Sequence, residues 1–138
     1  MTKVLQQYTI RKLRNPTEKM VDKDVEWVCN SLGFVTSRDH DKTAYRIMRA
    51  LINAAKKGTG MTSEELTRAV SPTVGSVIYH LNRLMKAGLA VKLDSKYELR
   101  MRSLLATIEE IQKEANMVID NIKAVARDID DNVGLENR

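Results

Sequence analysis

The chain has 138 residues and a net charge of +5, with 43% hydrophobic and 30% charged residues, as expected for a mostly helical globular domain. It contains no run of about 18 apolar residues, and its N-terminus lacks the apolar core of a signal peptide, so we expect a cytoplasmic protein with no membrane span. Cys29 is the lone cysteine, which excludes a disulfide within one chain and a thiolate metal site. We expect Cys29 to pack on a helix, with a redox-sensitive thiol as the alternative.

The charge is divided unevenly along the chain. Residues 1–102 carry 19 Lys or Arg and 10 Asp or Glu, whereas residues 103–138 carry 4 and 8. A basic body favours a polyanionic partner through phosphate contact and counterion release, and an acidic tail is repelled from such a partner. We therefore expect the tail to point away from the partner, unless the asymmetry is only a random sampling of surface charge.

Residues 1–16 form a basic N-terminal arm that carries Lys3, Arg11, Lys12 and Arg14 and no acidic residue. Pro16 prevents a helix from running through its end. The arm either touches phosphate or is simply mobile, as many chain termini are.

Residues 17–33 are predicted to form an amphipathic helix. Glu18 lies in its first turn, and Gly33 follows its last. Its apolar residues recur at intervals of three and four, with Trp27 beside them: Met20, Val21, Val25, Val28, Cys29 and Leu32. This stripe must bury against another element, and the long C-terminal helix is the predicted partner.

A linker from Phe34 to Asp41 follows. His40 lies in its polar cluster Arg38-Asp39-His40-Asp41, and we interpret it as a solvated residue and not as a metal ligand or catalyst. Asp39 or Asp41 can cap the next helix, which ends at Gly58-Thr59-Gly60. The apolar residues of that helix are Tyr45, Ile47, Met48, Leu51, Ile52 and Ala55.

Residues 41–100 are predicted to form a winged helix-turn-helix. Thr62 and Glu65 form a capping box that starts a short helix, and Pro72 stops it. Thr73 caps a second helix over residues 73–87, and Gly88 ends it in a left-handed conformation. Val77, Leu81 and Leu84, joined by Ile78 and Met85, should face the core, while His80 packs or touches DNA. The opposite face, free to enter a DNA major groove, carries Val74, Gly75, Ser76, Tyr79, Asn82, Arg83 and Lys86.

Residues 90–100 are predicted to form a two-stranded hairpin, the wing. Val91 and Leu93 alternate with Lys92 and Asp94, and the chain turns at Asp94-Ser95-Lys96. It then returns through Tyr97 and Leu99.

The region from residue 43 to residue 100 resembles the ArsR (arsenical-resistance-repressor) type of winged-helix regulator, especially its small archaeal members. The resemblance is carried by the segments Glu64-Glu-Leu-(x)-Arg-Ala-Val70, Ser76-Val-Ile-Tyr-His-Leu-Asn-Arg-Leu84 and Ala87-Gly-Leu-Ala-Val91. It implies a dimeric DNA-binding transcription regulator. It does not imply metal sensing, because the clustered Cys and His ligands of the metal-responsive members are absent from this sequence.

Residues 101–133 are predicted to form a long dimerisation helix, and its apolar stripe from Met101 to Ile129 spans about 43 Å at 1.5 Å per residue. Leu105, Ile119 and Ala126 widen its apolar stripe, which favours a bundle over a strict two-stranded coiled coil. The alternative is a long helix that folds back on its own domain. Beginning with Met101, the predicted seam steps by three and four through Leu104, Ile108, Ile111, Ala115, Val118, Ile122, Val125 and Ile129.

The candidate DNA contacts divide by chemistry. Tyr79, Asn82 and Arg83 should read the bases, and Asn82 and Arg83 have the bidentate geometry that distinguishes adenine and guanine edges. The alternative for Arg83 is an ion pair with a neighbouring carboxylate. The other candidates should hold the phosphate backbone or extend the basic face: Thr73, Ser76, Lys86, Lys92 and Lys96.

The pattern favours a homodimeric, sequence-specific transcription regulator that binds double-stranded DNA. The alternative from another class is a winged-helix module that holds a protein partner in a larger assembly, since one fold serves several functions. No phosphate-binding glycine loop, HExxH or CxxC motif is present, so we expect no enzyme, cofactor or metal. Whether a small-molecule effector controls binding stays open.

Overall fold

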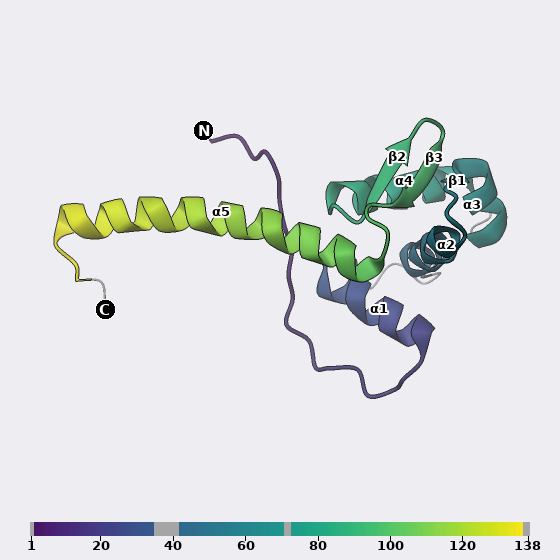
Figure 1. Cartoon of the computed structure of the whole chain (residues 1–138), viewed down its shortest axis with the longest axis horizontal. Helices are drawn as coiled ribbons and strands as arrows, with labels where there is room; N and C mark the ends of the chain where they lie inside the picture. Colours follow the sequence, from purple (N-terminus) through teal and green to yellow (C-terminus); the bar gives the residue numbers. More distant parts are fainter. Residues whose placement is uncertain (1, 35–41, 71–72, 137–138) are drawn as a thin grey trace.

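The computed structural model describes residues 2–34, 42–70 and 73–136, and Figure 1 shows their arrangement. The chain is mainly helical, with a small three-stranded antiparallel sheet and a long C-terminal helix, so the predicted fold class is confirmed at this level. No helix in the described ranges is both long and apolar enough to cross a membrane. The elements are α1 (Val21–Ser31), α2 (Thr43–Lys57), β1 (Met61–Thr62), α3 (Ser63–Val70), α4 (Val74–Lys86), β2 (Ala90–Leu93), β3 (Lys96–Leu99) and α5 (Leu104–Val133).

Helix α2 lies at the centre of the core, in contact with α1, α3, α4 and β3. Its Ile47 and Leu51 are fully buried. The predicted inner face of α4 is confirmed, because Val77, Leu81 and Leu84 also have no exposed surface. Burial of apolar surface of this kind is the main stabilising term in a small domain.

Helix α1 begins at Val21 and not at Thr17 as predicted. The preceding segment runs antiparallel beside it: the Arg11 amide donates to the Ser31 carbonyl at 2.7 Å, and the Trp27 indole donates to the Arg14 carbonyl at 2.8 Å. Residues 15–20 are therefore needed to reverse the chain. The main partner of α1 is α2 and not the predicted C-terminal helix, and Val25 and Cys29 are its buried residues.

The predicted signals at three helix ends are confirmed. The Thr62 hydroxyl accepts from the Glu65 amide at 3.1 Å, and the Glu65 carboxylate accepts from the Thr62 amide at 3.0 Å, which completes the capping box. The Thr73 hydroxyl accepts from the Ser76 amide at 3.3 Å. Gly88 has φ +85°, a value that suits glycine alone.

The predicted caps Asp39 and Asp41, together with His40 and Pro72, lie outside the described residues. The residue at the N-terminal cap of α2 is Lys42, which makes no capping hydrogen bond through its side chain. Helix α2 does end as predicted, at Gly58 with φ +74°.

The sheet has the order β1-β3-β2, and its first strand was not predicted. In β1, Met61 pairs with Tyr97 and Thr62 with Lys96. The hairpin forms as predicted, but its inner face is different: Ala90, Tyr97 and Leu99 are buried, whereas Leu93 is 57% exposed. The alternation of Val91 and Leu93 with Lys92 and Asp94 therefore does not bury Leu93, which ends β2 at the solvated turn.

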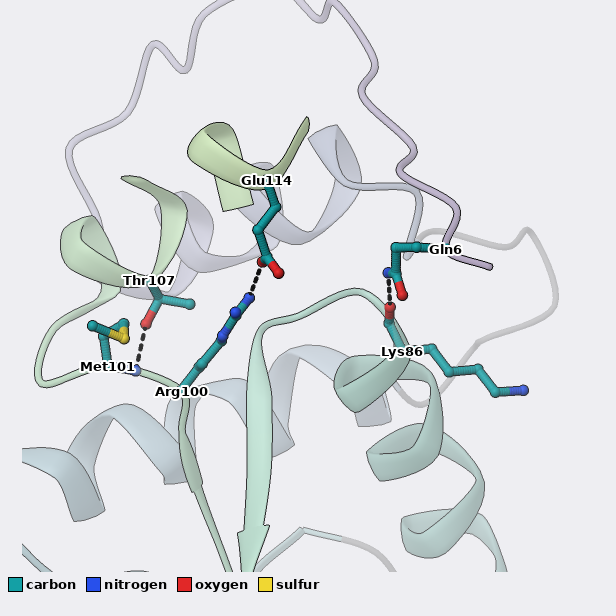
Figure 2. A network of polar contacts seen from close by, with 6 residues as sticks. All are labelled: Gln6, Lys86, Arg100, Met101, Thr107 and Glu114. Carbon is teal, nitrogen blue, oxygen red and sulfur yellow. Dashed lines mark hydrogen bonds and ion pairs between the residues drawn. The ribbon is translucent and has the colours of Figure 1, made fainter. Parts of the chain in front are cut away.

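The root of α5 is fastened to the body by polar contacts (Figure 2). The Arg100 guanidinium pairs with the Glu114 carboxylate, and the Met101 amide donates to the Thr107 hydroxyl at 3.0 Å. The Ser103 hydroxyl caps the helix by accepting from the Ala106 amide at 3.0 Å. The helix consequently starts at Leu104, three residues later than predicted.

Beyond its root, α5 projects away from the rest of the chain (Figure 1). Ile111 is only 5% exposed, and Leu104 and Ile108 pack on the core of their own chain. All three residues were predicted in the dimer seam. The prediction is wrong for Ile111, which the body buries, and the body covers part of Leu104 and Ile108. Every residue from Asn116 to Ile129 is exposed.

Candidate nucleic-acid interface

The outer face of α4 presents polar and basic groups to solvent. Tyr79 is 60% exposed, and Asn82 and Lys86 are also exposed, while Ser76 is half-buried beside the cap made by Thr73. No acidic residue lies on α4. The free amides at the start of this helix and its macrodipole add positive potential at the end nearest Thr73.

Arg83 differs from the other predicted contacts because its side chain is half-buried. Its guanidinium lies 5.3 Å from the centre of the Phe34 ring and 5.8 Å from the centre of the Tyr79 ring. It also donates to the Gly33 carbonyl at 3.4 Å, a long bond that adds little. Arg83 therefore joins α4 to the end of the α1 segment, a position that neither the base-reading nor the ion-pair prediction anticipated.

His80 lies on the inner side of α4 and is 9% exposed. Its ring meets the Tyr79 ring edge-on, with 5.2 Å between their centres. Of the two predicted alternatives, packing and DNA contact, the structure places His80 in packing.

The hairpin adds two exposed lysines beside α4, which contacts β2 (Figure 1). The Lys92 ammonium lies 5.4 Å from the centre of the Tyr97 ring, so its stem is supported while its charge stays in solvent. Lys96 lies at the start of β3, just after the turn that contains Asp94 with φ +58°. Asp94 is the carboxylate between these two lysines in the sequence and reduces the charge at the tip.

Glu65, near the start of α3, is a carboxylate whose pKa responds to a lysine of the hairpin. The backbone hydrogen bond from Thr62 is the largest cause that lowers its pKa, and Lys96 contributes a smaller lowering. Glu65 therefore stays ionised at neutral pH and weakens the field of Lys96, so Lys92 is the better phosphate-holding candidate of the two lysines.

From Gln6 to Arg14 the N-terminal segment is bonded to the body, whereas Val4 and Leu5 before it are exposed. The Gln6 side-chain amide donates to the Lys86 carbonyl at 2.7 Å (Figure 2), which satisfies one acceptor at the end of α4. Arg11 bonds the Asn30 side chain at 2.9 Å. Sequence reasoning missed these contacts, because no short-range signal connects residues that are 80 and 19 positions apart.

A groove of about 280 Å³ lies where this segment, the end of α1 and the end of α4 meet. Tyr8, Phe34 and Ile111 form part of its apolar wall, and Arg83 and Lys86 border it. Among the residues that the structure describes, no group of three or more His, Cys, Asp or Glu side chains could hold a metal ion. Cys29 is fully buried, and burial raises the pKa of its thiol to about 12.

Comparison of this chain with models of protein families, with curated proteins and with solved structures gave no match in any of the three.

Proposed function

We propose that the protein is a homodimeric winged helix-turn-helix transcription regulator that binds double-stranded DNA in a sequence-specific manner. In this proposal α4 enters the major groove, and the β2–β3 hairpin lies on the backbone or the minor groove. One observation carries the proposal: the outer face of α4 has no carboxylate and exposes Lys86, and the hairpin that contacts α4 through β2 exposes Lys92 and Lys96.

The charge of α5 supports the same orientation. The projecting part of this helix carries Asp120, Asp128, Asp130 and Asp131, and Figure 1 shows it extending away from the hairpin. An acidic segment that approached a duplex would lose the attraction that the basic body supplies. The resemblance of residues 43–100 to ArsR-type regulators points to the same function, without the metal-sensing part.

Within this proposal the candidate side chains divide into two groups. Tyr79 and Asn82 read base edges, because both are exposed on the middle of α4. Ser76, Lys92 and Lys96 hold phosphates, through a hydroxyl near a helix start and through two compact charges.

A titration with a fluorescent mixed-sequence duplex of about 30 base pairs at two salt concentrations tests the proposal, since the affinity must fall as salt rises. Lys92→Ala/Lys96→Ala should weaken binding several-fold and reduce the salt slope. The matched control is Lys123→Ala/Arg127→Ala, which removes the same charge from α5 and should change affinity much less. Equal losses in both double variants would exclude the hairpin as a specific contact. Footprinting across the protein's own promoter region would then locate an operator.

A protein-interaction module is the second candidate, and one observation favours it. Val74 at the start of α4 is 47% exposed and Tyr79 is 60% exposed, so the exposed surface of α4 has an apolar component. Absence of duplex binding at low salt by the full chain would replace the first proposal by this one.

A further inference from the structure

The distal half of α5 exposes an apolar stripe that its own chain does not cover. Val118, Ile122, Val125 and Ile129 are 40%, 60%, 59% and 55% exposed, and Ile119 beside them is 53% exposed. These side chains fall at intervals of three and four, so they share one face of the helix. A continuous apolar face of this kind in water indicates an interaction surface.

We propose that the occupant of this face is the same segment of a second copy, packed antiparallel, with Ile122 against Val125 of the partner subunit. The inference deepens the homodimer of the proposed function by assigning its interface and direction. It does not depend on DNA binding.

The two flanks of the stripe decide the direction. One flank is apolar and carries Ile119, Ala126 and Val133, whereas the other carries Glu114, Asn121 and Asp128. In a parallel pair the flank of one helix meets the opposite flank of the other, so Ile119 and Val133 would face carboxylates. In an antiparallel pair like flanks meet, so the apolar flanks join the seam and the carboxylates remain at the solvated edge. In an antiparallel pair the two helix macrodipoles are opposed, which adds a smaller preference for the antiparallel direction.

The body fixes the register. Ile111 is buried in its own core, and Glu114 pairs with Arg100, so a partner helix can begin to cover α5 only after Glu114. An antiparallel pair centred between Ile122 and Val125 overlaps over residues 115–132 of both chains, which includes the exposed residues 116–129. In that register Val118 lies opposite Ile129 of the partner subunit.

Other occupants fit less well. The polar face of the distal helix carries Asp120, Asp128, Asp130 and Asp131, and the only cations from residue 116 to residue 133 are Lys123 and Arg127. An anionic lipid surface or a nucleic acid would be repelled by this face. The N-terminal segment is already bonded to α1 and α4.

Cysteine cross-linking tests the direction without DNA. Val118→Cys and Ile129→Cys are made separately in the full chain with Cys29→Ser, one of them carrying a size tag, and are mixed before mild oxidation. The antiparallel register predicts a disulfide between the two variants and little within either, because like positions are about 16 Å apart along the axis at 1.5 Å per residue. Self-linked Val118→Cys and Ile129→Cys dimers would show a parallel pair and overturn the proposal.

Sedimentation of the unmodified chain tests the occupant. Dimers should form, and Ile122→Asp should weaken dimerisation by roughly 100-fold or more, since it buries a carboxylate in the seam. The matched control Asn116→Asp adds the same charge outside the seam and should stay within a few fold. A monomer at all concentrations, or a tetramer, would overturn the proposal of one second copy. DNA binding is measured separately, so failure here and failure of the proposed function give different results.

Discussion

Replacing Arg83 by alanine should weaken the fold more than it weakens base reading, contrary to the role that the sequence predicts for it. The guanidinium loses its contacts with the Phe34 and Tyr79 rings, at 5.3 and 5.8 Å. Partly exposed contacts of this type contribute about 0.5–1 kcal/mol each, and the buried stem adds packing. We therefore expect the free energy of unfolding to fall by about 1–1.5 kcal/mol, which at a typical slope lowers the urea midpoint by roughly 0.5 M.

Asn82 provides the contrasting variant. Its side chain is exposed and makes none of these contacts, so Asn82→Ala should leave the urea midpoint unchanged or slightly higher, because alanine is the better helix former. On a footprinted operator it should cost about 1–3 kcal/mol of binding free energy, and much less on random duplex. Lys86→Ala removes one positive charge without a ring contact and serves as the charge control for Arg83→Ala.

Trp27 fluorescence in urea and duplex titration on operator and random DNA measure the two effects in the same samples. The reasoning fails if Arg83→Ala keeps the wild-type urea midpoint and loses only its preference for the operator. In that case Arg83 reads a base, and its position over Phe34 belongs to the free protein alone.

Four further outcomes follow from positions described above. Ile111→Asp should unfold the body at a cost of several kcal/mol, because it buries a charge in the core; a folded monomer with native circular dichroism would show that the core tolerates it. Lys92→Ala should weaken operator and random DNA alike and reduce the slope of log affinity against log salt by roughly one, and a loss confined to the operator would contradict its phosphate role. Cys29 should react slowly with thiol reagents at pH 8 until urea unfolds the chain, and Cys29→Ser should change DNA affinity by no more than a few fold. The hydrogen bond from Arg100 lowers the pKa of Glu114 in the folded protein. The pair therefore stabilises the fold above the usual carboxyl pKa of 4.5, and this stability is lost as pH falls through the lower folded value. An acid denaturation curve of Glu114→Gln that matches wild type would contradict this.

Features encoded within a few residues were predicted correctly. The capping box of Thr62 and Glu65, the cap at Thr73 and the left-handed Gly88 each depend on bonds or dihedral angles within four positions of the chain. The inner face of α4 was also predictable, because a single period of 3.6 decides which of its residues are buried.

Features that depend on distant contacts were missed. Strand β1 exists because Gly60 lets the backbone approach β3, where an added Cβ would lie 2.7 Å from Glu98 Cγ and 3.0 Å from the Tyr97 carbonyl. The apolar stripe on α5 has the same spacing whether its neighbour is the body or another chain. The sequence therefore could not show that the body covers the stripe before Glu114 and leaves it exposed after Glu114. The half-buried position of Arg83 likewise requires Phe34, 49 residues earlier.

The fastening of α5 at Arg100, Met101 and Ser103 makes the helix a lever with its pivot at the body. From residue 115 to residue 133 the lever is about 28 Å long, so a tilt of about 10° at the pivot moves its far end by roughly 5 Å. That displacement is comparable to one turn of α-helix. In a dimer joined through two such helices, the distance between the two α4 helices would depend on residues at the root of α5, which lie outside the α4 face and the distal stripe. Within the proposed function, substitutions at Arg100 or Glu114 would then change the preferred spacing of the two half-sites while leaving every contact residue in place.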